Sequence, residues 1–162
     1  MYSQPGMYTM SPQMIAAVGV GCNVTSSSKY DDNHSVEGIV LNQVRTGGLA
    51  SSWCAKENNV NQWVKIYFGG NDFYVHKISI QGRHEFQQWV TKFGLEYTVD
   101  GIRWEKVHDG NPAAYHIFAG NNDCTTVVEQ NIYPVVAKAV KIVPLEWHGH
   151  ISMRCEVFIT KH

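Results

Sequence analysis

The stretch that decides the fold is Val140-Lys-Ile-Val-Pro-Leu-Glu-Trp-His-Gly-His-Ile-Ser-Met-Arg-Cys-Glu-Val-Phe158. Its two ends alternate between apolar and polar residues, which is typical of strands that pack one face on a core. Between them, residues 144–150 are polar, contain a glycine, and carry one aromatic residue and two histidines. Polar and aromatic groups that a loop holds on a rigid sheet commonly form binding surfaces. The stretch therefore predicts a β-sandwich that binds a ligand at its loop end.

Other strand-like segments recur along the chain with turn signals between them, and no helical periodicity persists. Asp100-Gly101 supplies the positive φ that a tight hairpin requires, so it predicts a hairpin of residues 93–98 and 102–107. Short strands at such spacing indicate an all-β sandwich or barrel. The other predicted strands are 62–68, 74–80, 125–128 and 137–143.

The length and composition predict one folded domain. The chain has 162 residues, of which 44% are apolar and 17% charged. Its net charge of −1 is not the excess of positive charge that is typical of a nucleic-acid-binding protein, and no apolar run is long enough to span a membrane. We expect residues 1–21 to be a flexible tail and 22–162 to be the domain. No Lys or Arg precedes the short apolar run at 15–20, so we do not recognise a signal peptide in it. The alternatives are another route of export, a leader that has been removed, or a protein that stays inside the cell.

The four cysteines are widely spaced and form no Cys-x-x-Cys pair, so a zinc site is not expected. Four cysteines allow three pairings. Cys22 and Cys155, in the first and last strand-like segments, are the candidate disulfide, and Cys54 with Cys124 is the remaining pair. The alternative is that all are buried free thiols.

Several short motifs follow one another in a recognisable order: Val24-Thr-Ser-Ser27, Trp53-Cys54, Asn61-Gln-Trp-Val64, Gln81-Gly82, Trp89-Val-Thr-Lys92, Tyr97-Thr-Val-Asp-Gly101 with Trp104, Gly120-Asn121, Pro144-Leu-Glu-Trp147, and Ile151-Ser-Met-Arg154 to Glu156. On these motifs residues 22–159 resemble the discoidin domain, also called the coagulation-factor type C domain. Tracts 88–91 and 147–156 are most similar to the N-terminal domain of slime-mould discoidin lectins. The resemblance implies an antiparallel eight-stranded jelly-roll β-sandwich, galactose-binding-domain-like, whose loops at one end bind carbohydrate, phospholipid headgroups, collagen or other proteins.

Two departures from the family limit what the resemblance carries over. The usual terminal cysteine pair is missing, which makes a Cys22–Cys155 bridge a candidate substitute. The slime-mould discoidins also carry a second lectin domain, whose sugar binding and oligomerisation are not carried over. The oligomeric state is therefore left open.

The binding loops of the family map to residues 29–35, 45–49, 83–88, 120–124 and 147–150. A sugar needs acceptors and donors for its hydroxyls and an apolar face on which to stack, and the loops 29–35 and 83–88 combine both. We expect the loop with His148 and His150 to converge with them. The alternative for any single residue is a solvated turn. The candidate ligand-binding residues are Tyr30, Asp31, Asp32, His34, Arg83, His84, Glu85, Phe86, His148 and His150.

Other conspicuous residues are expected to be structural. Trp147 is expected to pack beneath its loop, and the family pattern implies that Arg154 points inward and pairs with a carboxylate. We expect the remaining tryptophans to lie in the core, because each is at a strand edge or within an alternating run: Trp53, Trp63, Trp89 and Trp104.

Neither a metal nor catalysis is expected. Asp31 and Asp32 could form part of a calcium site, and Glu156 loosely matches a glutamate that holds a structural calcium in related sugar-binding domains. Asn42-Gln43 stands where the acidic partner is needed, so no metal or cofactor is assigned. No nucleophile elbow or phosphate-binding glycine loop occurs, so the chain is not expected to be an enzyme.

The leading hypothesis is a lectin-like domain that binds a glycan or glycoconjugate and mediates cell adhesion or glycan recognition. The alternative is a module that binds phospholipid at a membrane surface, or a protein-binding adhesion module. Membrane binding needs projecting apolar side chains, whereas Lys29, Asp31, Asp32 and His34 make the first loop polar, so sugar is favoured. We expect an extracellular or cell-surface protein with a cytoplasmic pool as the alternative.

Overall fold

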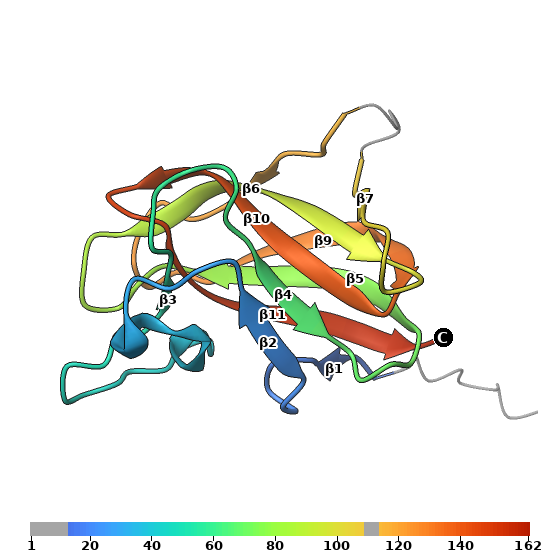
Figure 1. Cartoon of the computed structure of the whole chain (residues 1–162), viewed down its shortest axis with the longest axis horizontal. Coiled ribbons are helices and arrows are strands. Elements are labelled where there is room, and N and C mark those ends of the chain that lie inside the picture. Colours follow the sequence, from blue (N-terminus) through green and yellow to red (C-terminus); the bar gives the residue numbers. More distant parts are fainter. Residues whose placement is uncertain (1–12, 109–113) are drawn as a thin grey trace, which may run out of the picture.

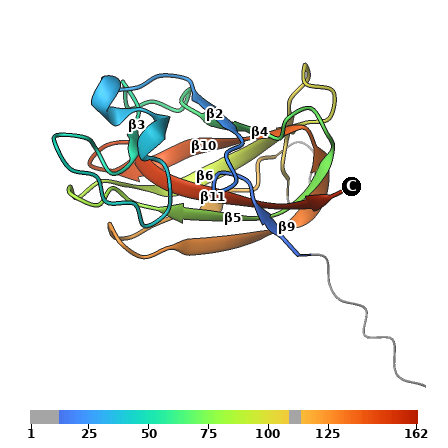
Figure 2. The same ribbon diagram turned by 90° about the horizontal axis from the view of Figure 1, so that it is seen from below.

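The computed structural model describes residues 13–108 and 114–162, which form two antiparallel sheets packed face to face (Figures 1 and 2). One sheet has the order β1-β11-β5-β9, with β3 paired to β11, and the other has the order β2-β4-β10-β6-β7, with β8 paired to β6. The predicted all-β sandwich is therefore confirmed. The strands are β1 (Ile15–Ala16), β2 (Asn23–Ser26), β3 (Trp53–Cys54), β4 (Val64–Tyr67), β5 (Phe73–Gln81), β6 (Trp89–Thr98), β7 (Glu105–Lys106), β8 (Phe118–Ala119), β9 (Val128–Ala137), β10 (Ala139–His148) and β11 (Ser152–Lys161).

The core lies between the sheets and is formed by the inward residues of the alternating strands. Ile78 and Ile80 of β5 and Val140 and Ile142 of β10 are fully buried, as their spacing predicts. The predicted 93–107 hairpin is also present as β6 and β7, and Gly101 has a φ of 85° in its turn.

The expectation that four tryptophans lie in the core is correct only for Trp53, which is fully buried. Trp63, Trp89 and Trp104 are half-buried. The ammonium of Lys141 on β10 lies 4.8 Å from the ring centroid of Trp63 and 4.0 Å from that of Trp104. The two indoles therefore cover a lysine on the outer face of the sheet through cation–π contacts.

The domain begins earlier than predicted, because part of the expected tail belongs to the sandwich. Ile15 pairs with Ile159 of β11, and Ala17 and Val18 are buried. The Glu156 carboxylate accepts hydrogen bonds from the backbone N–H of Val18 at 2.6 Å and the next residue at 2.9 Å, which fixes this segment to β11. Residues 1–12 of the expected tail lie outside the described residues.

The expected loop at 144–150 is mostly strand. β10 continues through Pro144 to His148 and pairs with β6, with register irregularities between Pro144 and Trp147. Proline is tolerated in a strand at such irregularities, because there the missing N–H costs no ladder bond. The turn itself is confined to the residues around Gly149, which has a φ of 74°.

The candidate disulfides are not formed. Cys22, Cys54, Cys124 and Cys155 are all free thiols. Cys22 precedes β2 in one sheet, whereas Cys155 lies on β11 in the other and is fully buried in the core. Burial and the nearby Glu156 carboxylate raise the pKa of both thiols. The alternative of free thiols is therefore the one observed.

The long loops gather at one end of the sandwich, at the left of Figure 1. The segment between β2 and β3 contains two 3₁₀ turns, η1 (Asp32–His34) and η2 (Val36–Gly38), and residues 82–88 connect β5 to β6. Within residues 13–108 and 114–162, no helix has the length and apolar character needed to cross a membrane. The fold thus places three of the predicted binding segments beside one another.

Candidate ligand-binding site

Arg154 on β11 anchors the loops of this end from below. Its side chain is 1% exposed. Nε donates to the carbonyl of Gly82 at 2.8 Å, Nη1 to that of Gln43 at 3.1 Å, and Nη2 to that of Cys124 at 2.8 Å. The expected carboxylate partner is replaced by these three carbonyls, because each belongs to a loop whose backbone has no sheet partner there. One guanidinium therefore holds three loops in place.

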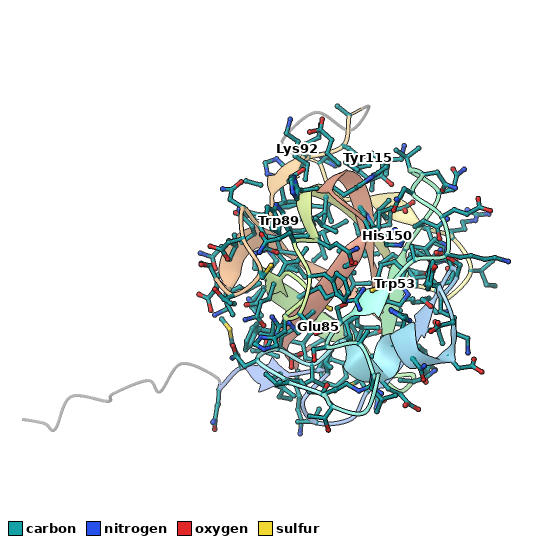
Figure 3. The ribbon with its side chains drawn as sticks, turned by 90° about the vertical axis from the view of Figure 1, so that its left-hand side faces the viewer. Trp53, Glu85, Trp89, Lys92, Tyr115 and His150 are labelled. Carbon is teal, nitrogen blue, oxygen red and sulfur yellow. The ribbon has the colours of Figure 1, made fainter. Side chains whose placement is uncertain are left out.

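Above this anchor the loops enclose a pocket of about 340 Å³. Figure 3 looks onto this end of the sandwich and labels Glu85 and His150. Five of the ten predicted residues line the pocket, together with two that were not selected from the sequence. The lining residues are Tyr30, His34, Cys54, Arg83, Phe86, Gln88 and His150.

Arg83 is the charged group of the pocket and is held by its own loop. Its Nε donates to Glu85 at 3.1 Å, its Nη1 donates to Gln88 at 3.1 Å, and its guanidinium lies 4.2 Å from the ring centroid of Phe86. Nη2 has no hydrogen-bond partner within the described part of the chain. A donor of fixed orientation is therefore left for an acceptor on a ligand.

The two histidines of the pocket are also held in defined orientations. His150 lies next to the carbonyl oxygen of Ala55, with Nε2 at 2.7 Å. This bond requires a proton on Nε2, so Nδ1 of the neutral ring is an acceptor. Nδ1 of His34 contacts the carboxylate of Asp31. Tyr30 packs edge-on against both rings, with centroid distances of 5.1 and 6.0 Å, and is 60% exposed.

Two of the predicted acidic residues do not line the pocket but contact residues that do. Asp31 caps η1 and binds His34, and this hydrogen bond is the main reason why the pKa of its carboxyl lies below the ordinary value. Glu85 accepts from the backbone N–H of Ser51 at 2.8 Å and from Arg83. Burial opposes the ionisation of Glu85, but these hydrogen bonds outweigh it and lower the pKa. Each thus positions a side chain that lines the pocket, since Asp31 holds His34 and Glu85 holds Arg83.

Three predicted residues are not brought into the pocket. Asp32 points to solvent and pairs with Lys29 at 2.8 Å, and His84 is exposed beside Arg83. His148 ends β10, where it is paired with Trp89 of β6 and stacks on that ring with a centroid distance of 4.4 Å, whereas His150 lies beyond the turn at Gly149.

Gln88 and Cys54 are the pocket residues that the sequence reasoning missed. Gln88 is within a mapped binding loop, but an amide at a loop end carries no distinctive signal. Its Oε1 accepts from Arg83 and, at 2.9 Å, from Ser152, so it connects the loop to β11. Cys54 stands out in the sequence only as a thiol. The neighbouring 120–124 loop contributes support, since the Cys124 thiol donates to the carbonyl of Phe86 at 2.9 Å.

Glu156 does not fit the role of a metal ligand. Its Oε1 also accepts from the backbone N–H of Val157 at 2.9 Å, so both of its oxygens are bound to main-chain donors near β1. Among the residues that the structure describes, no three His, Cys, Asp or Glu side chains are grouped to hold an ion.

Comparisons with known proteins agree with this fold. Residues 23–157 match the family model of the F5/8 type C domain. Discoidin-2 of Dictyostelium discoideum is 31% identical over 144 residues, and the match covers 84% of this chain and 53% of that protein. The chain thus spans about half the length of the curated relatives it matches.

Solved structures show the same sandwich. Wild-type discoidin II from Dictyostelium discoideum superposes with a TM-score of 0.83 at 26% identity, covering 97% of this chain and 60% of that one. A family 32 module of NanJ from Clostridium perfringens, solved in complex with galactose, has a TM-score of 0.65 at 16% identity and covers 90% and 99% of the two chains; it shares the fold. With the family model matched over most of its length, the chain belongs to the F5/8 type C, or discoidin, domain family.

Proposed function

We propose that this chain is a lectin-like domain that binds a saccharide in the loop-end pocket, in the service of cell adhesion or glycan recognition. The observation that carries the proposal is the combination of a fixed donor, a fixed acceptor and exposed rings in one cavity. Arg83 Nη2 donates and His150 Nδ1 accepts, while Phe86 and Tyr30 are 54% and 60% exposed. Vicinal hydroxyls need such paired groups, and the C–H face of a sugar stacks on a ring.

Relatives support this assignment. The discoidins are relatives of this chain, and the solved structures that share its fold include modules in complex with galactose and with GalNAc-β-1,3-galactose. We extend to this chain the class of ligand, a saccharide, and leave the particular sugar to experiment. We also propose that it acts by binding without catalysis and that it works outside the cell or at its surface. Its free thiols also fit a cytoplasmic pool, because disulfides are rare in that compartment.

The test is a glycan array followed by calorimetry with the best ligand. Arg83→Ala should weaken binding roughly 5- to 150-fold, because the removal of one partner of a buried hydrogen bond costs about 1–3 kcal/mol. His84→Ala is the matched control, since the adjacent side chain is exposed and outside the pocket. His150→Ala should weaken binding and His148→Ala should not. Full affinity in both Arg83→Ala and His150→Ala would place the site elsewhere.

A second candidate function is supported by the loop between η2 and β3. Val40, Val44 and Leu49 on this loop are 42%, 58% and 39% exposed. Apolar side chains that project from one end of a domain can enter a lipid interface or dock on a protein. Sedimentation with phosphatidylserine vesicles tests for the lipid-binding function. If the domain binds lipid through this loop, Val44→Asp should abolish binding to the vesicles and Arg83→Ala should leave it unchanged.

A further inference from the structure

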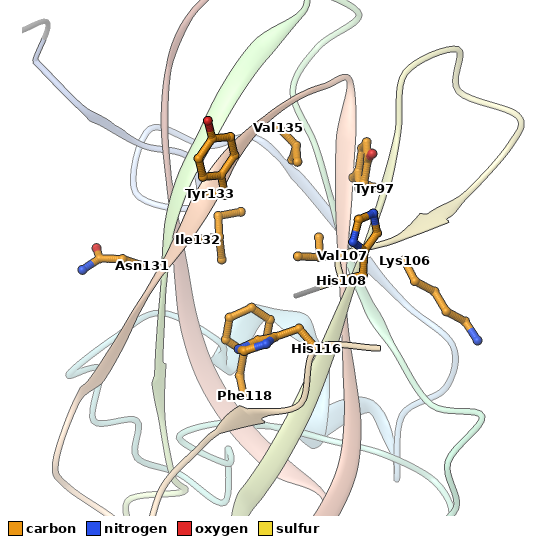
Figure 4. A pocket seen from close by; sticks show the side chains of 10 residues that line it. All are labelled: Tyr97, Lys106, Val107, His108, His116, Phe118, Asn131, Ile132, Tyr133 and Val135. Carbon is orange, nitrogen blue, oxygen red and sulfur yellow. The ribbon is translucent and has the colours of Figure 1, made fainter. Parts of the chain in front are cut away.

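A second cavity opens at the side of the sandwich, between the edges of the two sheets. It has a volume of about 250 Å³ and lies between β9 of one sheet and β6, β7 and β8 of the other (Figure 4). None of its lining residues lines the loop-end pocket. Neither the carbohydrate proposal nor the comparisons assign it a role.

The cavity adjoins an irregularity in the edge strand β9. Val135 pairs with Val75 and Asn131 pairs with Lys77, so residues 132–134 stand opposite the single residue His76. Extra residues of this kind bend an edge strand, and Pro134 supplies no N–H for pairing. The bulge turns Tyr133 outward, where it is 94% exposed, and leaves Ile132 facing the interior.

The floor of the cavity is apolar and its walls carry rings. Val107, Phe118 and Ile132 are 8%, 4% and 8% exposed and belong to the hydrophobic core. The ring of His116 lies edge-on to Phe118 at 4.2 Å, and Tyr133 stands on the opposite side in Figure 4. A cavity of about 150 Å³ with apolar walls can already hold benzene, so this one has room for a ring and a short substituent.

Three basic side chains are among the described residues that line the cavity. They are Lys106, His108 and His116, and no carboxylate is among the lining residues within 13–108 and 114–162; the Glu105 carboxylate lies outside the lining and accepts from the Tyr97 hydroxyl at 2.9 Å. The Lys106 ammonium lies 4.2 Å from the ring centroid of Tyr115 and points away from the cavity in Figure 4, but its flexible stem starts at the rim. An acceptor group on a ligand would therefore be favoured there and an ammonium group would not.

We propose that this cavity is a binding site for a small aromatic acid, a compound with one ring on the apolar floor and a carboxylate at the basic rim. The assignment does not depend on the carbohydrate site. The probe is 3-phenylpropionate, added to the isotope-labelled full chain and followed by two-dimensional NMR. A ligand of this size should bind in about the millimolar range or tighter and shift the resonances of Val107, Phe118 and Ile132.

Two neighbouring positions on β9 give a matched pair of variants. Val135→Phe adds a ring inside the cavity and should weaken binding at least about 10-fold, whereas Val136→Phe adds the same bulk on the opposite face and should leave it unchanged. Should Val135→Phe fail to fold, Tyr133→Ala removes a wall at an exposed position and should weaken binding several-fold. Arg83→Ala should bind the probe like the unmodified chain.

The charge assignment is tested with 3-phenylpropanol and 3-phenylpropylamine, which should bind progressively more weakly than the acid. Equal binding of all three would overturn the proposal of an acid, and unchanged binding in Val135→Phe and Tyr133→Ala would overturn the site. Analytical sedimentation could instead show a dimer that Val135→Phe dissociates, together with no binding of the probe. That result would identify the cavity as a contact between two copies of the chain and would also overturn the proposal of a ligand site.

Discussion

Replacing Arg154 with lysine should destabilise the domain although the charge is kept. The guanidinium reaches three carbonyls of three loops at 2.8–3.1 Å, and an ammonium at one point can replace at most one of these bonds. A hydrogen bond to a charged group contributes about 1.5–3 kcal/mol, so the loss of two predicts a decrease of about 3–6 kcal/mol in unfolding free energy. For a chain of this length each kcal/mol corresponds to about 2–4 °C in Tm, which gives a decrease of at least about 6 °C.

Urea denaturation and calorimetry measure this effect, with Arg103→Lys as the control. Arg103 is exposed in the turn after β6, so its substitution should change the stability by less than about 0.5 kcal/mol. Saccharide affinity should fall in Arg154→Lys even at temperatures where the domain is folded, because Gly82 precedes the Arg83 loop. An Arg154→Lys variant as stable as Arg103→Lys would refute the view that the three-carbonyl contact holds the loops.

Three further results are expected. Glu156→Gln should lower the unfolding free energy by about 2–4 kcal/mol, because an amide nitrogen must face a backbone donor, and thermal melts should show no such loss for the exposed Glu146→Gln. The hydrogen bond with His34 lowers the pKa of the Asp31 carboxyl in the folded chain. The turn should therefore be stabilised at pH values above the ordinary pKa of 3.8 and should lose this stabilisation as pH falls through the lower folded pKa; an NMR titration of the turn residues that is identical in Asp31→Asn would contradict this. The buried Cys155 thiol, whose pKa burial raises, should resist iodoacetamide at about pH 8 until the chain unfolds, and rapid alkylation of the native protein would contradict its position in the core.

Local patterns in the sequence were sufficient to predict most of the strands. Alternation placed Ile78 and Ile80 in the core, and Asp100-Gly101 marked the β6–β7 hairpin, because side-chain direction and turn conformation depend on neighbouring residues alone. The loop containing residues 144–150 was misplaced for the same reason. Its proline and glycine resemble a loop locally, but pairing with β6 extends β10 to His148.

The composition of the pocket was predicted only in part. His148 and His150 are equivalent in the sequence, and only the turn at Gly149 decides that His150 enters the pocket. The partners of Arg154 are main-chain carbonyls, which no sequence pattern reveals. Trp63 is half-buried on the outer face, where the β4–β10 register brings Lys141 to its ring, and no local pattern reveals this register.

The anchor beneath the loops has a consequence for how such a domain can diversify. Arg154 binds only main-chain oxygens, so it does not depend on which side chains Gln43 and Cys124 carry. Substitutions in the loops above can therefore accumulate, by natural drift or in a laboratory library, while the same guanidinium keeps the backbone in register. If this one interaction is kept, the same fold can acquire new ligand specificities while the backbone of its binding loops stays unchanged.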